Sequence, residues 1–238
     1  MTQQLICRRI LLKLSGEALM SDSTNSLDPQ ILTRLANEVT ELSKAGVQIG
    51  IVIGGGNIFR GASLTTTGIN RVAADHIGML ATVMNALAMQ SALEQCKQSV
   101  VVMSAVKISQ MCEDYNYRRA IQYLEQGTVT LFAAGTGNPC FTTDSAASLR
   151  AIEINADLLI KATKVNGIYS DDPIKNPAAL FFSRLSYDQA IRDNLKVMDI
   201  SALVLCRDYA MPLRILNIYA AGALMRLLHG EDIGSLVQ

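Results

Sequence analysis

Two glycine turns, each with a basic residue at hand, are the features of this chain best suited to chemistry. Gly54-Gly55-Gly56 follows an apolar run and precedes Arg60, and Ser15-Gly16 follows a second apolar run that carries Lys13. Glycines let main-chain N–H groups approach an anion closely, and a cation beside them can hold phosphate oxygens. Two such turns behind two predicted strands indicate a protein that binds two phosphorylated ligands, as a kinase does.

Lys13 stands near the end of a predicted buried strand, where an unpaired ammonium group is costly. We therefore expect it to project toward an anion; the alternative is a lysine whose charged end reaches water at the sheet edge. The chain has no Gly-x-x-x-x-Gly-Lys-Ser/Thr sequence, which excludes a P-loop enzyme. The spacing of Gly54-Gly55-Gly56 does not match a dinucleotide fingerprint, which argues against a dehydrogenase.

The segment from Gly135 to Asp144 is a second candidate site. It follows one predicted strand and opens a predicted helix, which Thr142, Thr143 or Asp144 can cap. Backbone amides at a helix start, together with threonine hydroxyls, can bind an anion. An ordinary capped turn is the alternative, but the length of this turn and its place at a strand's carboxyl end favour ligand contact.

Residues 161–173 follow another predicted strand and form a third candidate loop. Tyr169 could stack on a base, and Thr163 and Asp172 could hydrogen-bond to one. The alternative is a surface turn held by its Asn-Gly and Asp-Pro pairs. Asp75, early in a long predicted helix, could stabilise the helix dipole or accept hydrogen bonds from ribose hydroxyls.

Apolar runs alternate with helical patterns along the whole chain. Strands are predicted at 10–14, 48–53, 100–103, 129–134, 158–160 and 213–218. Helices are predicted at about 73–95, 117–126, 144–154, 187–194 and 201–209, with one more between the Asp28-Pro29 cap and Gly46. This alternation predicts an α/β fold with a mostly parallel sheet and right-handed crossovers, in one domain spanning residues 1–238.

The predicted helix at 73–95 is apolar around most of its circumference, so it is expected to be buried in the core or against another subunit. Its apolar residues include Ile77, Met79, Leu80, Val83, Met84, Leu87 and Ala88.

Composition narrows the possible functions. The 238 residues are 50% hydrophobic and carry 21 basic and 21 acidic side chains, with no basic stripe of the kind that nucleic-acid-binding proteins use. The five cysteines are scattered, which favours reduced thiols over disulfides or a metal cluster. No signal peptide and no membrane span is expected, so we predict a soluble, cytoplasmic protein without membrane or nucleic-acid partners.

Taken together, these segments resemble the bacterial uridylate (UMP) kinases of the amino acid kinase family. The matching stretches are 9–19, 52–61, 75–84, 134–147, 161–172 and 195–199. The resemblance implies an αβα sandwich with a mostly parallel central sheet, and transfer of the γ-phosphoryl group of Mg-ATP to UMP in pyrimidine biosynthesis. It also implies a homohexamer and feedback inhibition by UTP. The N-terminal part would mainly bind UMP, and the C-terminal part would mainly bind ATP.

The resemblance also assigns roles to individual residues. The ATP site would comprise Lys13, Leu14, Ser15, Gly16, Gly56, Arg60, Thr163, Tyr169 and Asp172. The UMP site would comprise Gly55, Asp75, Thr136, Gly137, Asn138, Pro139, Cys140, Phe141, Thr142 and Thr143. Lys13, Arg60 and Asp144 would be catalytic, and Mg²⁺ would be held mainly by the ATP phosphates.

Elementary chemistry agrees with these roles. The nucleophile would be an oxygen of the UMP phosphate, which is already anionic at neutral pH, so no general base is required. The site must supply in-line positioning and positive charge on the equatorial oxygens. We expect Lys13, Arg60 and Mg²⁺ to supply the charge, and Asp144 to orient a lysine.

The chain departs from the family pattern at three places. Residues 21–26 contain no glycine where relatives carry a glycine-rich loop tied to GTP activation, so the resemblance does not extend to GTP control. Cys140 replaces a common aromatic residue beside the uracil pocket, and Asn166 replaces a usual aspartate in the nucleotide loop.

Two other functions remain open at this stage. One is a different kinase of the same family that acts on carbamate, glutamate or aspartate, although Arg60 and Asp75 suit a nucleotide acceptor better. The other is a nucleotide-binding protein that kept the fold without turnover, against which the presence of Lys13, Arg60 and Asp144 argues.

Overall fold

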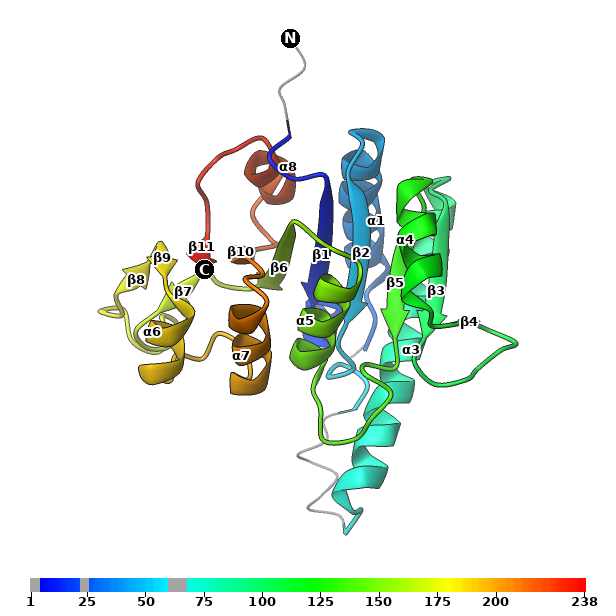
Figure 1. Cartoon of the computed structure of the whole chain (residues 1–238), viewed down its shortest axis with the longest axis horizontal. Coiled ribbons are helices and arrows are strands. Elements are labelled where there is room, and N and C mark those ends of the chain that lie inside the picture. The colour runs from blue at the N-terminus through cyan, green and yellow to red at the C-terminus, as the bar shows by residue number, and fades with distance from the viewer. Residues whose placement is uncertain (1–4, 22–25, 60–67) are drawn as a thin grey trace.

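A largely parallel sheet forms the centre of the molecule, because most of its strands are apolar on both faces. The computed structural model describes residues 5–21, 26–59 and 68–238. In that part of the chain the main sheet has nine strands in the order β4-β3-β5-β2-β1-β6-β10-β11-β9 (Figure 1). The strands are β1 (Arg9–Leu14), β2 (Gln48–Ile53), β3 (Val100–Ser104), β4 (Glu113–Asp114), β5 (Val129–Ala133), β6 (Leu158–Thr163), β9 (Arg184–Leu185), β10 (Leu213–Asn217) and β11 (Ser235–Val237).

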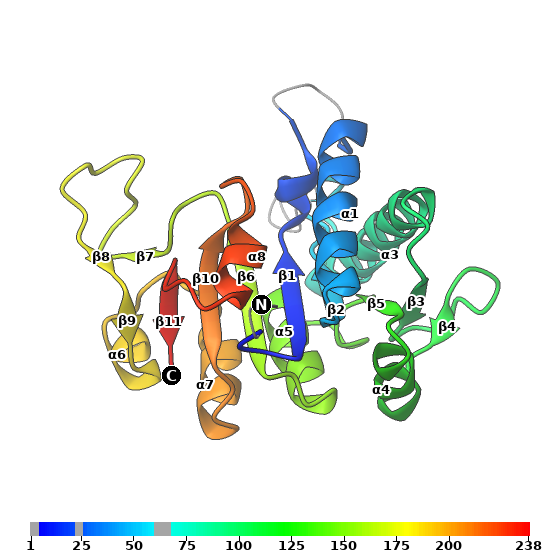
Figure 2. The same cartoon turned by 90° about the horizontal axis from the view of Figure 1, so that it is seen from above.

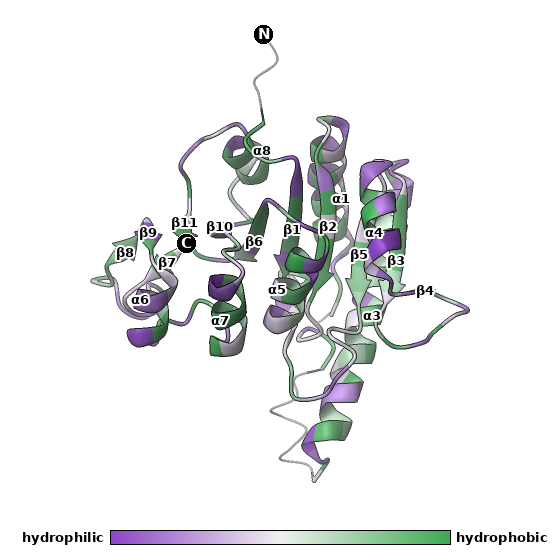
Figure 3. Cartoon of the chain, in the orientation of Figure 1, coloured by the Kyte–Doolittle hydropathy of each residue, from purple (hydrophilic) through white to green (hydrophobic). Residues whose placement is uncertain are grey.

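Helices cover both faces of this sheet. One face is covered by α1 (Pro29–Lys44), α3 (Arg71–Gln95) and α8 (Ala223–Leu228), and the other by α4 (Tyr117–Glu125), α5 (Thr143–Glu153), α6 (Tyr187–Arg192) and α7 (Ile200–Asp208) (Figure 2). Hydrophobic residues dominate the central strands, and hydrophilic ones gather on the outer helices and loops (Figure 3). The expected αβα sandwich is confirmed. Among the strands of the described residues, every pair from β4 to β10 is parallel, and only β10 with β11 is antiparallel within this sheet.

The strand order brings four turns to one edge of the sheet. β1 lies between β2 and β6, so the chain changes direction across the sheet at β1. Because β1, β2, β5 and β6 are parallel, their carboxyl ends share this edge, where open α/β sheets bind their ligands.

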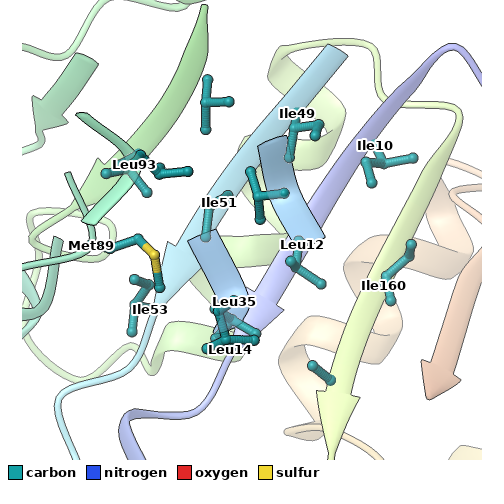
Figure 4. Packing of buried hydrophobic residues seen from close by; sticks show 14 of the residues in the cluster. Ile10, Leu12, Leu14, Leu35, Ile49, Ile51, Ile53, Met89, Leu93 and Ile160 are labelled. Carbon is teal, nitrogen blue, oxygen red and sulfur yellow. The ribbon is translucent and has the colours of Figure 1, made fainter. Parts of the chain in front are cut away.

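The main core lies between the sheet and the layer formed by α1, α3 and α8. Ile10, Leu12, Ile51 and Ile53 project from the strands, and Met89 of α3 points toward Ile53 (Figure 4). All of these side chains are buried, and the exposed fraction of Met89 is 0%.

Local sequence signals set the ends of α1. The Asp28 side chain accepts hydrogen bonds from the backbone N–H groups of Gln30 and Ile31, with Pro29 at the first helical position. Beyond the other end, Gly46 has a φ of 94°, a left-handed conformation that glycine adopts without strain. The predicted cap and stop are both confirmed.

Other predicted elements are correct to within a few residues, and one of these small differences affects the site. The strand expected at 158–160 continues to Thr163, which places Lys161 inside β6 rather than in the loop that follows. The sequence patterns missed α8 and the shortest strands, including β7 (Ile168–Tyr169) and β8 (Phe181–Phe182), which form a separate antiparallel pair. Strands of two residues are too short to show an alternating pattern, so only tertiary pairing reveals them.

Helix α3 is long and apolar enough to cross a membrane by length and composition alone. No membrane span was expected from the sequence, and Met79, Val83 and Met89 of this helix pack into the hydrophobic core. Leu80 and Met84 are each 54% exposed on the opposite side of the helix. Of the two expectations for α3, core burial is confirmed for one side only.

Replacing Met89 tests the contribution of this core. Met89→Ala should lower the free energy of unfolding by about 2–5 kcal/mol, because it leaves a cavity that the sheet and α3 cannot close. Met89→Leu, which nearly conserves volume, should cost less than about 1.5 kcal/mol. Denaturant unfolding followed by circular dichroism measures both, and equal stability of the two variants would contradict the packing described here.

Candidate active site

A buried carboxylate joined to two lysines lies at the carboxyl edge of the sheet. Asp144 Oδ1 is 2.7 Å from Lys13 Nζ, and Asp144 Oδ2 is 2.9 Å from Lys161 Nζ. Lys161 Nζ also donates a hydrogen bond to the backbone carbonyl of Val197 at 2.6 Å. The three charged side chains are 8–17% exposed, and together they carry one net positive charge.

The two lysines meet because Lys13 and Lys161 are register partners on the adjacent strands β1 and β6. Register partners project from the same face of a sheet. That face is covered by α5, which carries Asp144 in its first turn. Thr142 caps this helix, with its hydroxyl accepting from the Asp144 N–H at 3.1 Å, so the cap helps to hold the carboxylate within reach of both lysines.

Charge and burial act against each other on the pKa values in this cluster. Burial alone raises the pKa of Asp144, but the ammonium groups of Lys13 and Lys161 outweigh it, and the pKa lies below its ordinary value. Burial lowers the pKa of Lys161, and the like charge of Lys13 adds to this, while Asp144 opposes both. Asp144 is therefore an ionised ion-pair partner, with little tendency to accept a proton.

A pocket of about 620 Å³ includes in its lining Thr142 and Thr143, the residues directly before Asp144. It is bounded by the glycine turn after β2, the start of α3 and the loop after β5. The residues expected to bind UMP that line it are Gly55, Asp75, Thr136, Phe141, Thr142 and Thr143. Gly56, which was expected on the ATP side, also lines this pocket.

The loop after β5 is held from two directions. Ala134 and Gly135 both have a φ of 60°, and this left-handed turn is fixed by two helices. The Ala134 N–H donates to Thr82 Oγ1 of α3 at 2.8 Å, and Arg150 Nη2 of α5 donates to the Gly135 carbonyl at 3.2 Å. The loop is thus anchored to helices on both faces of the sheet.

Asp75 has a structural contact that the sequence did not predict. Its Oδ2 accepts the Cys140 N–H at 2.8 Å, and Arg71 Nε donates to Oδ1 at 2.9 Å. The carboxylate therefore stabilises the tip of the loop while it lines the pocket. Cys140 itself is exposed, with a φ of 69°, and all five cysteines are free thiols.

A second pocket, of about 350 Å³, includes Lys161 of the cluster in its lining. Lys161, Thr163, Tyr169 and Asp172 all line it, so the three residues expected to hold the ATP nucleoside are brought together. The Tyr169 ring is braced edge-on by Phe181, with ring centroids 5.3 Å apart. Thr163 donates its hydroxyl to the Val165 carbonyl at 2.7 Å, so its oxygen lone pairs remain available to a ligand.

The two glycine turns are in direct contact. A Cβ added to Gly16 would lie 2.6 Å from the Gly54 carbonyl oxygen and 2.8 Å from the Gly56 nitrogen. The Gly54 N–H also donates to the Leu14 carbonyl at 2.9 Å. Glycine is required at position 16 because any side chain would push the turns apart.

The start of α7 connects the two pockets. The Thr142 hydroxyl donates to the carboxylate of Asp199, the residue that precedes α7, and the Ser145 and Ser201 hydroxyls are 3.1 Å apart. Residues 193–197, just before Asp199, line the second pocket, whereas Thr142 lines the first.

Several predicted residues do not contact a pocket or are not described. Gly137, Asn138, Pro139 and Cys140 belong to the loop after β5 but do not line the first pocket. Leu14 is fully buried, so only its main chain could meet a ligand. Arg60 and most of the segment 21–26 lie outside the described residues.

The sequence-based prediction included Lys161 and Asp199 in candidate segments but gave neither of them a role in the site. Lys13 was identified as a lysine within an apolar run. Lys161 would have shown the same pattern if the predicted strand had extended three residues further. Asp199 could not have been found in this way, because its partner is 57 positions away in the sequence.

Asp144→Asn tests the buried ion pairs. It should lower the free energy of unfolding at pH 7 by about 3–5 kcal/mol, because two ammonium groups lose their counter-charge. The pKa of Asp144 is lower in the folded protein, so its stabilisation is fully present above the unfolded pKa and is lost as pH falls through the folded pKa. The difference from wild type should therefore shrink below about pH 4.

Denaturant unfolding at pH 7 and pH 3 measures this change, with Asp208→Asn on the surface as a control that should differ little from wild type at either pH. A stability difference for Asp144→Asn that does not depend on pH would contradict an ionised carboxylate.

The chain is similar to known proteins over almost its whole length. Residues 8–217 match the amino acid kinase family. A protein named uridylate kinase from Methylococcus capsulatus is 65% identical over 232 residues, which is 98% of this chain and 97% of that protein. Another of that name, from Xanthomonas oryzae, is 59% identical over 99% of this chain and 98% of that protein.

Solved structures agree with the sequence comparison. The crystal structure of UMP kinase from Bacillus anthracis superposes with a TM-score of 0.94 at 38% identity, covering 98% of this chain and 96% of that one. UMP kinase from Ureaplasma parvum gives a TM-score of 0.91 at 34% identity, with 97% and 98% covered.

Proposed function

This chain belongs to the amino acid kinase family, and we propose that it is an enzyme that transfers the γ-phosphoryl group of ATP to UMP, giving ADP and UDP. The observation that carries the proposal is the Lys13–Asp144–Lys161 cluster: Lys161 lines one pocket, and Thr143, next to Asp144 in the chain, lines another, and the linings of the two suit two nucleotides. The names of relatives that match over almost their full length support UMP as the acceptor.

The cluster suits phosphoryl transfer because it supplies positive charge without a base. The attacking oxygen of UMP is already anionic, so no proton has to be removed. Asp144 fixes Lys13 and Lys161 in place, and the excess positive charge can stabilise the equatorial oxygens of the phosphoryl group in flight. Arg60 remains a proposed third cation.

The second pocket would hold the adenosine of ATP. Tyr169 offers a ring for stacking, and Thr163 and Asp172 offer hydrogen-bonding atoms. The ATP phosphates would extend toward Lys13, Ser15, Gly16 and Gly56. The C-terminal part of the chain thus contributes most of the proposed ATP site.

The first pocket would hold UMP. Gly55 and the start of α3 face one side of it, and Thr136, Phe141, Thr142 and Thr143 face the other. Asp75 would accept from ribose hydroxyls while holding the Cys140 N–H. Gly137, Asn138 and Pro139 would meet UMP only through movement of their loop.

Mg²⁺ would enter with ATP. Both oxygens of Asp144 are engaged by lysines, and the described residues contain no group of three or more His, Cys, Asp or Glu side chains that could enclose a metal ion. This donor set fits a cation that ATP phosphates carry, since Mg²⁺ in such sites binds few protein ligands. The metal would neutralise phosphate charge, and the protein would position the phosphates.

We also propose that the chain forms a homo-oligomer, a hexamer by the resemblance, through the apolar side of α3. Leu80 and Met84 are exposed on α3, a helix whose N-terminal part extends beyond the sheet (Figure 1). UTP, which shares its uracil with UMP, is the proposed feedback inhibitor. Pyrimidine biosynthesis in the cytoplasm is the proposed setting.

The activity is tested by ADP release from Mg-ATP with UMP, CMP, dUMP, carbamate, glutamate and aspartate offered separately. Turnover should be greatest with UMP, and Lys13→Ala should reduce kcat by about 10²–10³-fold because it removes a transition-state donor. Turnover with an amino acid or carbamate, or none with any acceptor, would overturn the proposed function. A near-normal kcat in Lys13→Ala would overturn the role of this lysine.

The assembly is tested with Leu80→Gln and Met84→Gln, alone and combined. The double variant should elute as a smaller species in size-exclusion chromatography with light scattering, because the apolar contact between copies is lost. Tyr209→Gln removes another exposed side chain, outside α3, and should leave the mass unchanged. An unaltered mass for the double variant would exclude this face as the interface.

A further inference from the structure

Two buried asparagines hydrogen-bond to each other through their side-chain amides and contact the glycine turns. Asn57 Nδ2 donates to Asn85 Oδ1 at 3.0 Å, and Asn85 Nδ2 donates to Asn57 Oδ1 at 2.7 Å. Asn57 follows the turn after β2, and Asn85 lies in the middle of α3. Their exposed fractions are 8% and 0%, so water does not substitute for these contacts.

Each asparagine uses its second amide proton to hold another segment. Asn85 Nδ2 donates to the Gly54 carbonyl at 2.7 Å. This bond ties the Gly54-Gly55-Gly56 turn, which borders the proposed UMP pocket, to α3. Asn57 Nδ2 donates to the Ser26 carbonyl at 2.7 Å, which ties the same turn to the segment before α1. All four amide protons of the pair are therefore used.

The pair also supports the Ser15-Gly16 turn, which is proposed to contact the phosphates of ATP. A Cβ added to Gly16 would lie only 2.3 Å from Asn57 Oδ1, so the Ser15-Gly16 turn rests directly on this side chain. The same added atom would meet the Gly54 carbonyl oxygen, which Asn85 holds. Asn57 and Asn85 thus contact both glycine turns.

We propose that Asn57 and Asn85 are positioning residues that set the separation of the donor and acceptor phosphates. This inference rests on the proposed function of the chain. Each nucleotide is held by its own pocket, so the pair contributes little to the binding of either nucleotide alone. It determines how the two turns lie relative to each other, which matters only when both phosphates are present.

Amides suit this position better than charged groups. An asparagine supplies donors and an acceptor without charge, and an ionised side chain would be costly in a site closed to water. A fully satisfied buried polar network is also rigid. Rigidity is needed because a displacement of about 1 Å between reacting groups can cost about 10²-fold in rate.

The test uses Asn85→Asp and Asn57→Asp, which keep side-chain size but replace donors with an acceptor. In Asn85→Asp, a carboxylate oxygen would face the carbonyl oxygens of Gly54 and Asn57. Measurements are kcat with saturating ATP and UMP, and the Kd of each nucleotide with the other absent. We expect kcat to fall by about 10–100-fold while both Kd values stay close to wild type.

Asn116→Asp is the matched control. Asn116 caps α4 by accepting hydrogen bonds from two backbone N–H groups, a role that a carboxylate fills equally well. Its kcat should equal that of wild type. If Asn85→Asp does not fold by circular dichroism, Asn57→Asp and the shorter Asn57→Ser provide the same comparison at the less buried member of the pair.

The outcomes separate this inference from the proposed function. Wild type that phosphorylates UMP together with folded pair variants of normal kcat would overturn the positioning role alone. A loss of UMP or ATP binding as large as the loss of kcat would also overturn it, because the pair would then support one pocket only. Wild type without turnover on any acceptor would overturn the proposed function itself.

Discussion

The active edge of this protein depends on one buried carboxylate that must stay ionised between two lysines. Transferring an ionised carboxylate from water into the protein interior is unfavourable, and so is placing two ammonium groups side by side. Lys13, Asp144 and Lys161 offset these costs together, because Asp144 is the counter-charge of both lysines and the two lysines keep Asp144 ionised. The geometry of the surrounding elements follows from the need to hold these three groups together.

The parallel sheet meets this need through register. Lys13 and Lys161 are register partners on adjacent parallel strands, so they lie side by side. Asp144 contacts them from the first turn of α5, a capped helix that packs on this face of the sheet. The crossover from β5 through α5 to β6 brings the acceptor loop and the second lysine to the same edge. A cluster that spans the chain from residue 13 to residue 161 is therefore built from backbone geometry more than from flexible loops.

Around this charged centre, neutral polar contacts connect the two pockets. Thr142 with Asp199 links the acceptor loop to the start of α7, and Asn57 with Asn85 links the two glycine turns to α3. A reaction between two bound phosphates gains most from such links, because its rate depends on the relative position of two ligands. The charged cluster thus supplies the electrostatic stabilisation, and the neutral polar contacts around it position the two ligands.

The sequence by itself determined the fold class, the two glycine turns and some of the residues that line each pocket. Apolar runs, caps such as Asp28-Pro29 and glycines at strand ends are local signals, since they reflect the conformational preference and burial of neighbouring residues. Thr163, Tyr169 and Asp172 were predicted to share a ligand because they lie close together in the sequence, and all three line the second pocket. Tertiary structure decided the rest: the inclusion of Lys161 in β6, its pairing with Lys13, and the contacts made by Asp199 and Asn85. Those depend on register and helix packing between segments far apart in the chain, and no local pattern encodes which distant side chains will meet.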